Sequence, residues 1–224
     1  MKNIFFAAAL VLIGLTPWSQ GQDSDSLNLA ADQADSMNKL DDLMGRAQKR
    51  LEYILTNLGD LQAGNGAKKA YDEFKDNLED LKDIRGDIKD RTEKVRDLQG
   101  SRIAAWTKEV SGMNDKEMRK LTNDQIDKAK ADFDSLDKQI REVGGDANDL
   151  TTLLEDLKKY FDSSYSADSV KTAGPMIDKA RTSGREMQKS VDALRDTLYK
   201  NKKEVKGTPV SAGSRRFSFT SSGF

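Results

Sequence analysis

The sequence contains no cysteine and no histidine, and only three prolines among its 224 residues. Without histidine the chain lacks the commonest general base and the commonest zinc ligand, and it cannot form a Ser–His–Asp triad. Without cysteine it has no thiol nucleophile, thiolate metal site or disulfide. We therefore expect a non-enzymatic protein with no catalytic residues, no metal site and no cofactor.

Carboxylates are abundant, but they do not form an evident catalytic pair. Adjacent acids such as Asp41 and Asp42 do not face each other on a helix, so we interpret them as solvated surface. A carboxylate hydrolase acting on cell-wall glycans stays open as a rival, because it needs only two acids on facing helices beside a concave pocket. Residues 22–200 carry a net charge of -6, which disfavours nucleic acid as a partner.

Hydrophobic residues are also few, at 36%, against 33% charged residues. This balance is typical of long helices with one narrow apolar stripe. No proline interrupts the run from Trp18 to Gly174, which favours uninterrupted helices over strands and turns.

The N-terminus differs from the rest of the chain. Lys2 precedes an apolar run over residues 4–15, and small residues follow it, with a cleavage point before Gln22. The run is shorter than the roughly 20 residues of a membrane-spanning helix. It predicts a signal peptide over residues 1–21 and export of the mature chain to the periplasm or medium. An uncleaved membrane anchor is the alternative.

Apolar residues then recur at alternating spacings of three and four, which places them in one line along a helix. The first stripe is Met37, Leu40, Met44, Ala47, Leu51, Ile54, Leu58 and Leu61. Residues 63–66, AGNG, favour a helix end and a tight reversal. A second, looser stripe starts near Ala67 and ends near Val110, with Gly112 as a left-handed cap and Arg91 at a position where an apolar residue was due.

The stretch SGMNDKEMRKL, residues 111–121, has the pattern of a helix start. Asn114 is the expected N-cap, with Glu117 completing a capping box. Met113 and Met118 would pack as a hydrophobic staple. A start at Thr122 is the alternative.

The third stripe is the most regular in the chain. It keeps its phase through Gly144 and Gly145, which predicts one helix through the pair, with the glycines at a bend or at the close approach of a neighbouring helix. Its residues are Ile126, Ala129, Phe133, Leu136, Ile140, Val143, Ala147, Leu150, Leu154, Leu157 and Phe161.

A fourth stripe runs from Val170 to Leu198. Its helix begins either at Ser166, with a kink, or at Pro175 as the first helical residue. The small residues Ala173, Ala180 and Gly184 allow a partner helix to come close.

These stripes predict an all-α fold, an elongated antiparallel coiled-coil bundle of three long helices with an N-terminal helix packed alongside. The expected domains are a signal peptide at 1–21, the helical domain at 22–200, and a flexible tail at 201–224. The tail is basic, with a net charge of +4.

Three segments together resemble a known family. They are AAWTKEV, then SGMNDKEMRKLTNDQIDKAKADFDSL, and LLEDLKKYFDSSYSADSV. Over residues 38–200 the chain resembles the exported bacterial proteins grouped as domain of unknown function 2959. The resemblance implies a helical coiled-coil protein with no assigned activity or functional residues. Many members resemble lipoproteins, whereas this chain lacks the cysteine that lipid attachment needs.

We therefore expect an exported coiled-coil protein of the bacterial cell envelope that acts as a spacer or interaction partner, with a protein partner or self-association. The alternative is reversible binding of an anionic membrane surface by amphipathic helices and the tail. Candidate interaction residues are Trp106, Tyr160, Tyr165, Arg215, Arg216, Phe217 and Phe219.

Overall fold

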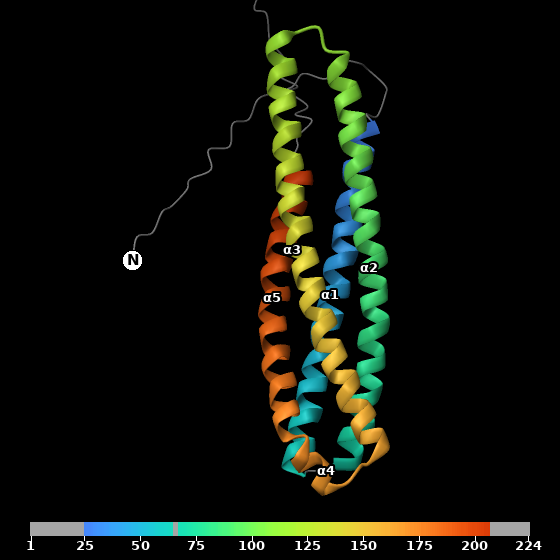
Figure 1. Cartoon of the computed structure of the whole chain (residues 1–224). Helices are drawn as coiled ribbons and strands as arrows, with labels where there is room; N and C mark the ends of the chain where they lie inside the picture. Colours follow the sequence, from blue (N-terminus) through green and yellow to red (C-terminus); the bar gives the residue numbers. More distant parts are fainter. Residues whose placement is uncertain (1–24, 65–66, 207–224) are drawn as a thin grey trace, which may run out of the picture.

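The computed structural model describes residues 25–64 and 67–206, and within them every regular element is a helix. The elements are α1 (Asp25–Ala63), α2 (Ala67–Ser111), α3 (Lys116–Ser163), α4 (Ala167–Thr172) and α5 (Gly174–Lys206). The four long helices lie side by side in an elongated antiparallel bundle, with α4 at one end and the α2–α3 loop at the other (Figure 1). The predicted all-α bundle is confirmed.

The predicted stripes form the core of this bundle. Every residue of the first stripe is buried except Ala47, which is half-buried. α3 passes through Gly144 and Gly145 as one helix of 48 residues, as predicted, and is roughly 70 Å long at 1.5 Å per residue.

The N-terminal helix is more than an addition to three core helices. α1 packs along α2 more extensively than any other two helices pack, and it also lies against α5. α3 completes the bundle between α5 and α2, and its contact with α2 is the least extensive of the four neighbouring pairs. The bundle is therefore closed around α1 and weakest between α2 and α3.

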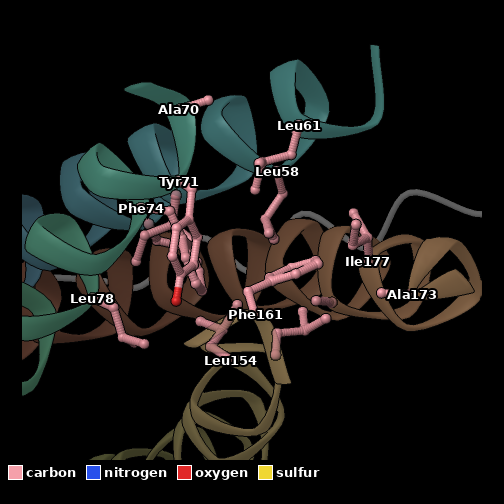
Figure 2. Packing of buried hydrophobic residues seen from close by; sticks show 14 of the residues in the cluster. Leu58, Leu61, Ala70, Tyr71, Phe74, Leu78, Leu154, Phe161, Ala173 and Ile177 are labelled. Atoms are coloured by element: carbon pink, nitrogen blue, oxygen red, sulfur yellow. The ribbon is translucent and has the colours of Figure 1, made fainter. Parts of the chain in front are cut away.

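The buried residues form two clusters, one toward the α4 end and one toward the α2–α3 loop. In the first, Tyr71 and Phe74 of α2 meet Phe161 of α3 between Leu58 of α1 and Ile177 of α5 (Figure 2). Val143 and Val191 are partly buried and pack against both clusters. The two clusters are therefore joined by side chains that are less buried than the residues of either cluster.

The start of α3 corrects one prediction. The N-cap is Asp115 rather than Asn114, and its carboxylate accepts hydrogen bonds from the backbone amides of Glu117 and Met118, both at 2.9 Å. The carboxylate of Asp115 also interacts favourably with the positive end of the helix dipole, which adds to the stability of this cap. The cap therefore lies one residue later than expected, so the capping box built on Asn114 is wrong, and Thr122 lies inside the helix. The packing of Met113 against Met118 stays a prediction.

The glycines at the two corners behave differently. Gly64 has a φ of 74° and donates a hydrogen bond to the carbonyl of Leu61 at 3.2 Å, so it ends α1 in the left-handed conformation as expected. Among the described glycines it alone has a positive φ. The predicted left-handed cap at Gly112 is therefore wrong, and this corner closes by a hydrogen bond from the Gly112 amide to the carbonyl of Glu109.

Both proposed starts of the fourth helix are used, each by a different helix. Ser166 caps the short α4 and forms a reciprocal capping box with Ser169. Pro175 lies in the first turn of α5, where its missing N–H leaves no hydrogen bond unmade. α5 continues to Lys206 and buries Val205, so the helical part extends past residue 200. The expected signal peptide and the tail from residue 207 lie outside the described residues.

Candidate functional site

A groove opens between α2 and α3 midway along the bundle, and we call it the α2–α3 groove. Its volume is about 910 Å³, near the upper end of the roughly 300–1,000 Å³ of small-molecule sites. α2 and α3 form its walls, while α1 and α5 supply an apolar floor. The floor residues are Met44, Leu51, Met187, Val191 and Leu194.

At the level of the groove, the apolar stripes are less buried than elsewhere along the bundle. Stripe residues on all four long helices line it and are only half-buried, although their neighbours along each stripe are mostly buried. These half-buried residues are Ala47, Ile88, Ile140, Val143, Ala147 and Val191. The groove is therefore a part of the apolar interior that remains accessible to solvent from the side.

Three exposed glycines line the mouth of the groove: Gly86 on α2, and Gly144 and Gly145 on α3. A Cβ atom built at any of them would meet no atom within 4 Å. The prediction of a close neighbouring helix at Gly144 and Gly145 is therefore wrong. Each glycine destabilises its helix by about 1 kcal/mol relative to alanine, and no packing contact requires it.

Polar bridges between α2 and α3 bound the mouth at both ends. At one end, Arg85 donates to Thr151 Oγ1 at 2.5 Å and to Asn148 Oδ1. At the other, Asp137 accepts from Arg96 Nε at 2.6 Å. Both bridges define the same antiparallel register, which places Lys89 of α2 opposite the glycine pair.

In the bridge between Arg96 and Asp137, the carboxylate is buried. The Asp137 side chain is 8% exposed and also pairs with Arg141. Burial alone would raise the pKa of this carboxyl, but hydrogen bonds from Arg141 and Arg96 outweigh it and hold the pKa below its ordinary value. Asp137 therefore stays ionised and neutralises part of the positive charge beside the groove.

The groove lining is basic although the body of the protein is acidic. Five basic residues and one acidic residue line it. The acid, Glu155, pairs with Lys82 at 2.6 Å, so the groove does not offer the two free carboxylates that a hydrolase of the rival type needs. Burial lowers the pKa of the Arg85 guanidinium, yet an arginine stays charged at neutral pH.

One stripe of α2 carries the polar groups of the groove. Arg85, Lys89, Thr92 and Arg96 follow one another at spacings of four, three and four, which aligns them along one side of the helix. Thr92 is buried, and within residues 25–64 and 67–206 its hydroxyl has no hydrogen-bond partner. A buried hydroxyl without a partner is uncommon in a folded protein.

Beyond Thr92, α2 contributes to a buried polar layer between α1 and α2. Gln33 Nε2 of α1 donates to Gln99 Oε1 at 2.7 Å, and Arg102 Nη1 donates to Gln33 Oε1 at 3.3 Å. The three-and-four spacing that contains Ile88 continues through Thr92 and Val95 to Gln99 and Arg102. This spacing is the sequence signal for the buried polar layer. A search for apolar residues alone misses it, because most of these positions are polar.

The structure separates the candidate interaction residues rather than bringing them together. Trp106 is half-buried on α2, with the guanidinium carbon of Arg102 5.3 Å from its ring centroid. Tyr160 and Tyr165 lie near the opposite end of the bundle. Arg215, Arg216, Phe217 and Phe219 lie outside the described residues, so their predicted role stays a prediction.

Tyr160 and Tyr165 belong to an aromatic cluster that packs against the core. Tyr165 stacks on Tyr71 with ring centroids 5.1 Å apart, and Tyr160 meets Phe161 edge-on at 5.5 Å. The Tyr71 hydroxyl donates to Asp162 Oδ1 at 2.6 Å, and burial together with this hydrogen bond raises the pKa of Tyr71 well above its ordinary value. These contacts stabilise the α4 end, whereas an interaction role for the two tyrosines stays a prediction.

Two further searches of the described part of the chain have negative results. No group of three or more acidic residues there is arranged to hold a metal ion. No helix within the same residues is long and apolar enough to span a membrane.

The architecture places the protein among the all-α antiparallel helical bundles, here with a lateral groove. Within that class, the chain belongs to the family described as Protein of unknown function (DUF2959), whose model matches residues 30–206. The match covers all five helices except the first turns of α1. No curated protein and no solved structure gives a significant match. The family resemblance is confirmed, and it transfers no activity to this chain.

Proposed function

We propose that this chain is an exported, non-enzymatic helical protein of the bacterial cell envelope that acts as a spacer or protein-interaction partner. The observation that supports it most is the long bundle itself, in which α2 and α3 each run for roughly 70 Å. A rod of this kind holds its two ends at a fixed separation. The apolar run over residues 4–15 supports export.

Export is tested by fusing the full chain to alkaline phosphatase, which becomes active only outside the cytoplasm. We expect activity from the full chain and none after deletion of residues 1–21. A matched control replaces Leu10 and Leu12 with arginine, which interrupts the apolar run without shortening the chain, and it should also be inactive. Equal activity with and without residues 1–21 would exclude export by this segment.

An interaction role is tested in cells by placing a photo-crosslinking residue at exposed apolar positions. Tyr53, Leu121 and Tyr199 are 42%, 39% and 51% exposed and lie on three different helices, so together they sample much of the rod. We expect one crosslinked species of defined mass from at least one of them, and none from the buried control position Leu58. If none of the three gives a crosslink, the interaction role is wrong and only the spacer role remains.

One observation favours membrane-surface binding as a second candidate. The exposed Tyr199 ring near the end of α5 has Lys203 Nζ and Lys202 Nζ at 4.6 and 5.1 Å from its centroid. The chain continues from there to Arg215 and Arg216. Basic groups beside aromatic ones suit an anionic lipid surface, to which each cation contributes about 1 kcal/mol.

Vesicle flotation tests this candidate. The truncation must follow Lys206, since Val205 is buried and Glu204 pairs with Lys128 at 3.2 Å. We expect the chain from Gln22 to float with anionic vesicles. The chain ending at Lys206 keeps Tyr199, Lys202 and Lys203 but loses Arg215 and Arg216, so we expect it to float less. Absence of flotation in both forms would remove this candidate.

A further inference from the structure

We propose that the α2–α3 groove is a binding site for a single-chain anionic amphiphile, a fatty acid, with its carboxylate at the mouth between Arg85 and Lys89 and its acyl chain on the apolar floor. This site is separate from the basic tail and goes beyond a spacer or interaction role. Two independent features of the groove support it: its shape and its charge.

The shape suits one extended chain rather than a compact ligand. The two bridges that bound the mouth, at Arg85 and at Arg96, are roughly 16 Å apart along α2. Between them lie half-buried apolar side chains from all four long helices. Covering such surface with methylene groups is favourable by about 0.8 kcal/mol for each buried methylene.

The charge selects an anionic head group. The lining carries five basic residues and one acid, whereas residues 22–200 as a whole are acidic. Asp137 pairs with both Arg96 and Arg141 and so offsets one of their two charges, and Glu155 neutralises Lys82. Arg85 instead bonds only neutral oxygens, of Thr151 and Asn148, and within the described ranges Lys89 is in no salt bridge.

The donors for the head group come from Arg85 and Lys89. Arg85 has N–H groups beyond those that bond Thr151 and Asn148, and the Lys89 ammonium offers three donors. Thr92 lies one turn further along α2, and its hydroxyl is buried below the mouth, so it is not assigned to the head group. Hydrogen bonds to a charged group contribute about 1.5–3 kcal/mol each.

The chain's own tail fits this groove poorly. Residues 207–224 include Arg215 and Arg216 and no acidic residue, so their charge has the same sign as that of the lining. A second copy of the chain is the remaining protein occupant, and its binding would appear as a dimer.

The test measures binding of dodecanoate, below its micelle concentration, to the chain from Gln22 to Phe224 by calorimetry at pH 7. We expect one site with a dissociation constant in the micromolar range. The uncharged analogue dodecanol should bind at least about tenfold more weakly, since it loses more than 1.4 kcal/mol of charge-assisted bonding. No binding of dodecanoate at about 1 mM, or equal binding of both compounds, would overturn the proposal.

Matched variants locate the site. Gly144→Leu places a side chain in the mouth and should weaken dodecanoate binding at least about tenfold, whereas Gly100→Leu, in open surroundings on α2 outside the groove, should leave it unchanged. Both replace an exposed helical glycine, so both should fold, which circular dichroism checks. Binding that Gly144→Leu does not weaken would place the ligand elsewhere and overturn the assignment.

Charge variants and the tail complete the test. Lys89→Gln should weaken dodecanoate binding about tenfold, and Lys189→Gln on the exposed side of α5 should not. Ending the chain at Lys206 should leave dodecanoate binding unchanged, which separates this site from membrane binding by the tail. A dimer in light scattering that Gly144→Leu dissociates would assign the groove to a second copy and overturn the proposal.

Discussion

Two interfaces of this bundle use glycine in opposite ways. Where α1 meets α5, a Cβ atom built at Gly184 would lie 2.5 Å from Leu55 Cδ2, so any other residue there would force the Leu55 side chain to shift. Where α2 meets α3, Cβ atoms at Gly86, Gly144 and Gly145 would meet nothing within 4 Å. At the first interface, which we call closed, the helices pack directly against the glycine. At the second, which we call open, the glycines line the groove and touch no neighbouring helix. Glycine in a helix therefore has no single structural meaning until its neighbours are known.

The largest expected effect comes from disturbing the closed interface. Gly184→Val adds two methyl groups where even one Cβ is too close to Leu55, and overpacking of this kind typically costs 1–3 kcal/mol. We expect the free energy of unfolding to fall by about 3 kcal/mol, measured by urea denaturation. Gly100→Val, in open surroundings, is the matched control and should cost less than about 1 kcal/mol. Similar losses in both variants would mean that the α1–α5 interface is not tightly packed.

A smaller effect is expected at the bridge between α2 and α3. Asp137→Asn removes the carboxylate that pairs with Arg96 and Arg141, and we expect a loss of about 2 kcal/mol at pH 7. The folded-state pKa of Asp137 is lowered, so its contribution is complete above the ordinary pKa of 3.8. It disappears as the pH falls through the lowered value.

Denaturant unfolding of both proteins across pH 2–7 measures this dependence. The difference between the wild type and Asp137→Asn should shrink toward zero at the acidic end. Glu142→Gln, which removes an exposed pair with Lys138, is the control and should change stability by less than about 1 kcal/mol at any pH. A constant difference between Asp137→Asn and the wild type would show that the ion pair does not account for the loss.

The smallest effect should have the opposite sign. Gly144→Ala improves helix propensity and meets no atom within 4 Å, so we expect stabilisation by about 1 kcal/mol. Thermal unfolding followed by circular dichroism should show a higher midpoint. Destabilisation by this change would mean that α3 is closely packed at this position and that the groove is narrower than the structure shows.

Much of the fold could be predicted from the sequence because apolar periodicity determines which side of a helix is buried. It predicted the unbroken helix through Gly144 and Gly145, and the small-residue approach at Gly184. The corner at Asp115 was misplaced by one residue, because Asn114 and Asp115 are both good caps and local sequence does not decide between them.

The groove could not be predicted in the same way. It depends on the register and separation of α2 and α3, which are tertiary properties that no single stripe contains. The sequence did show that the second stripe is looser than the others, but it predicted Arg91 as the polar residue that interrupts the stripe. The structure instead shows that Thr92 occupies the buried position of the stripe. The difference of one residue decides whether a polar group points to solvent or into the bundle.

The absence of cysteine from the chain allows a direct test of the open interface by thiol labelling. A single cysteine at Val143, which is half-buried in the groove, is compared with one at Ala180, which is fully buried. The account predicts that Val143→Cys reacts rapidly in the folded protein and is protected by dodecanoate, while Ala180→Cys reacts only as the protein unfolds. Equally slow labelling of both positions would contradict the account, because it would show that the bundle is closed between α2 and α3.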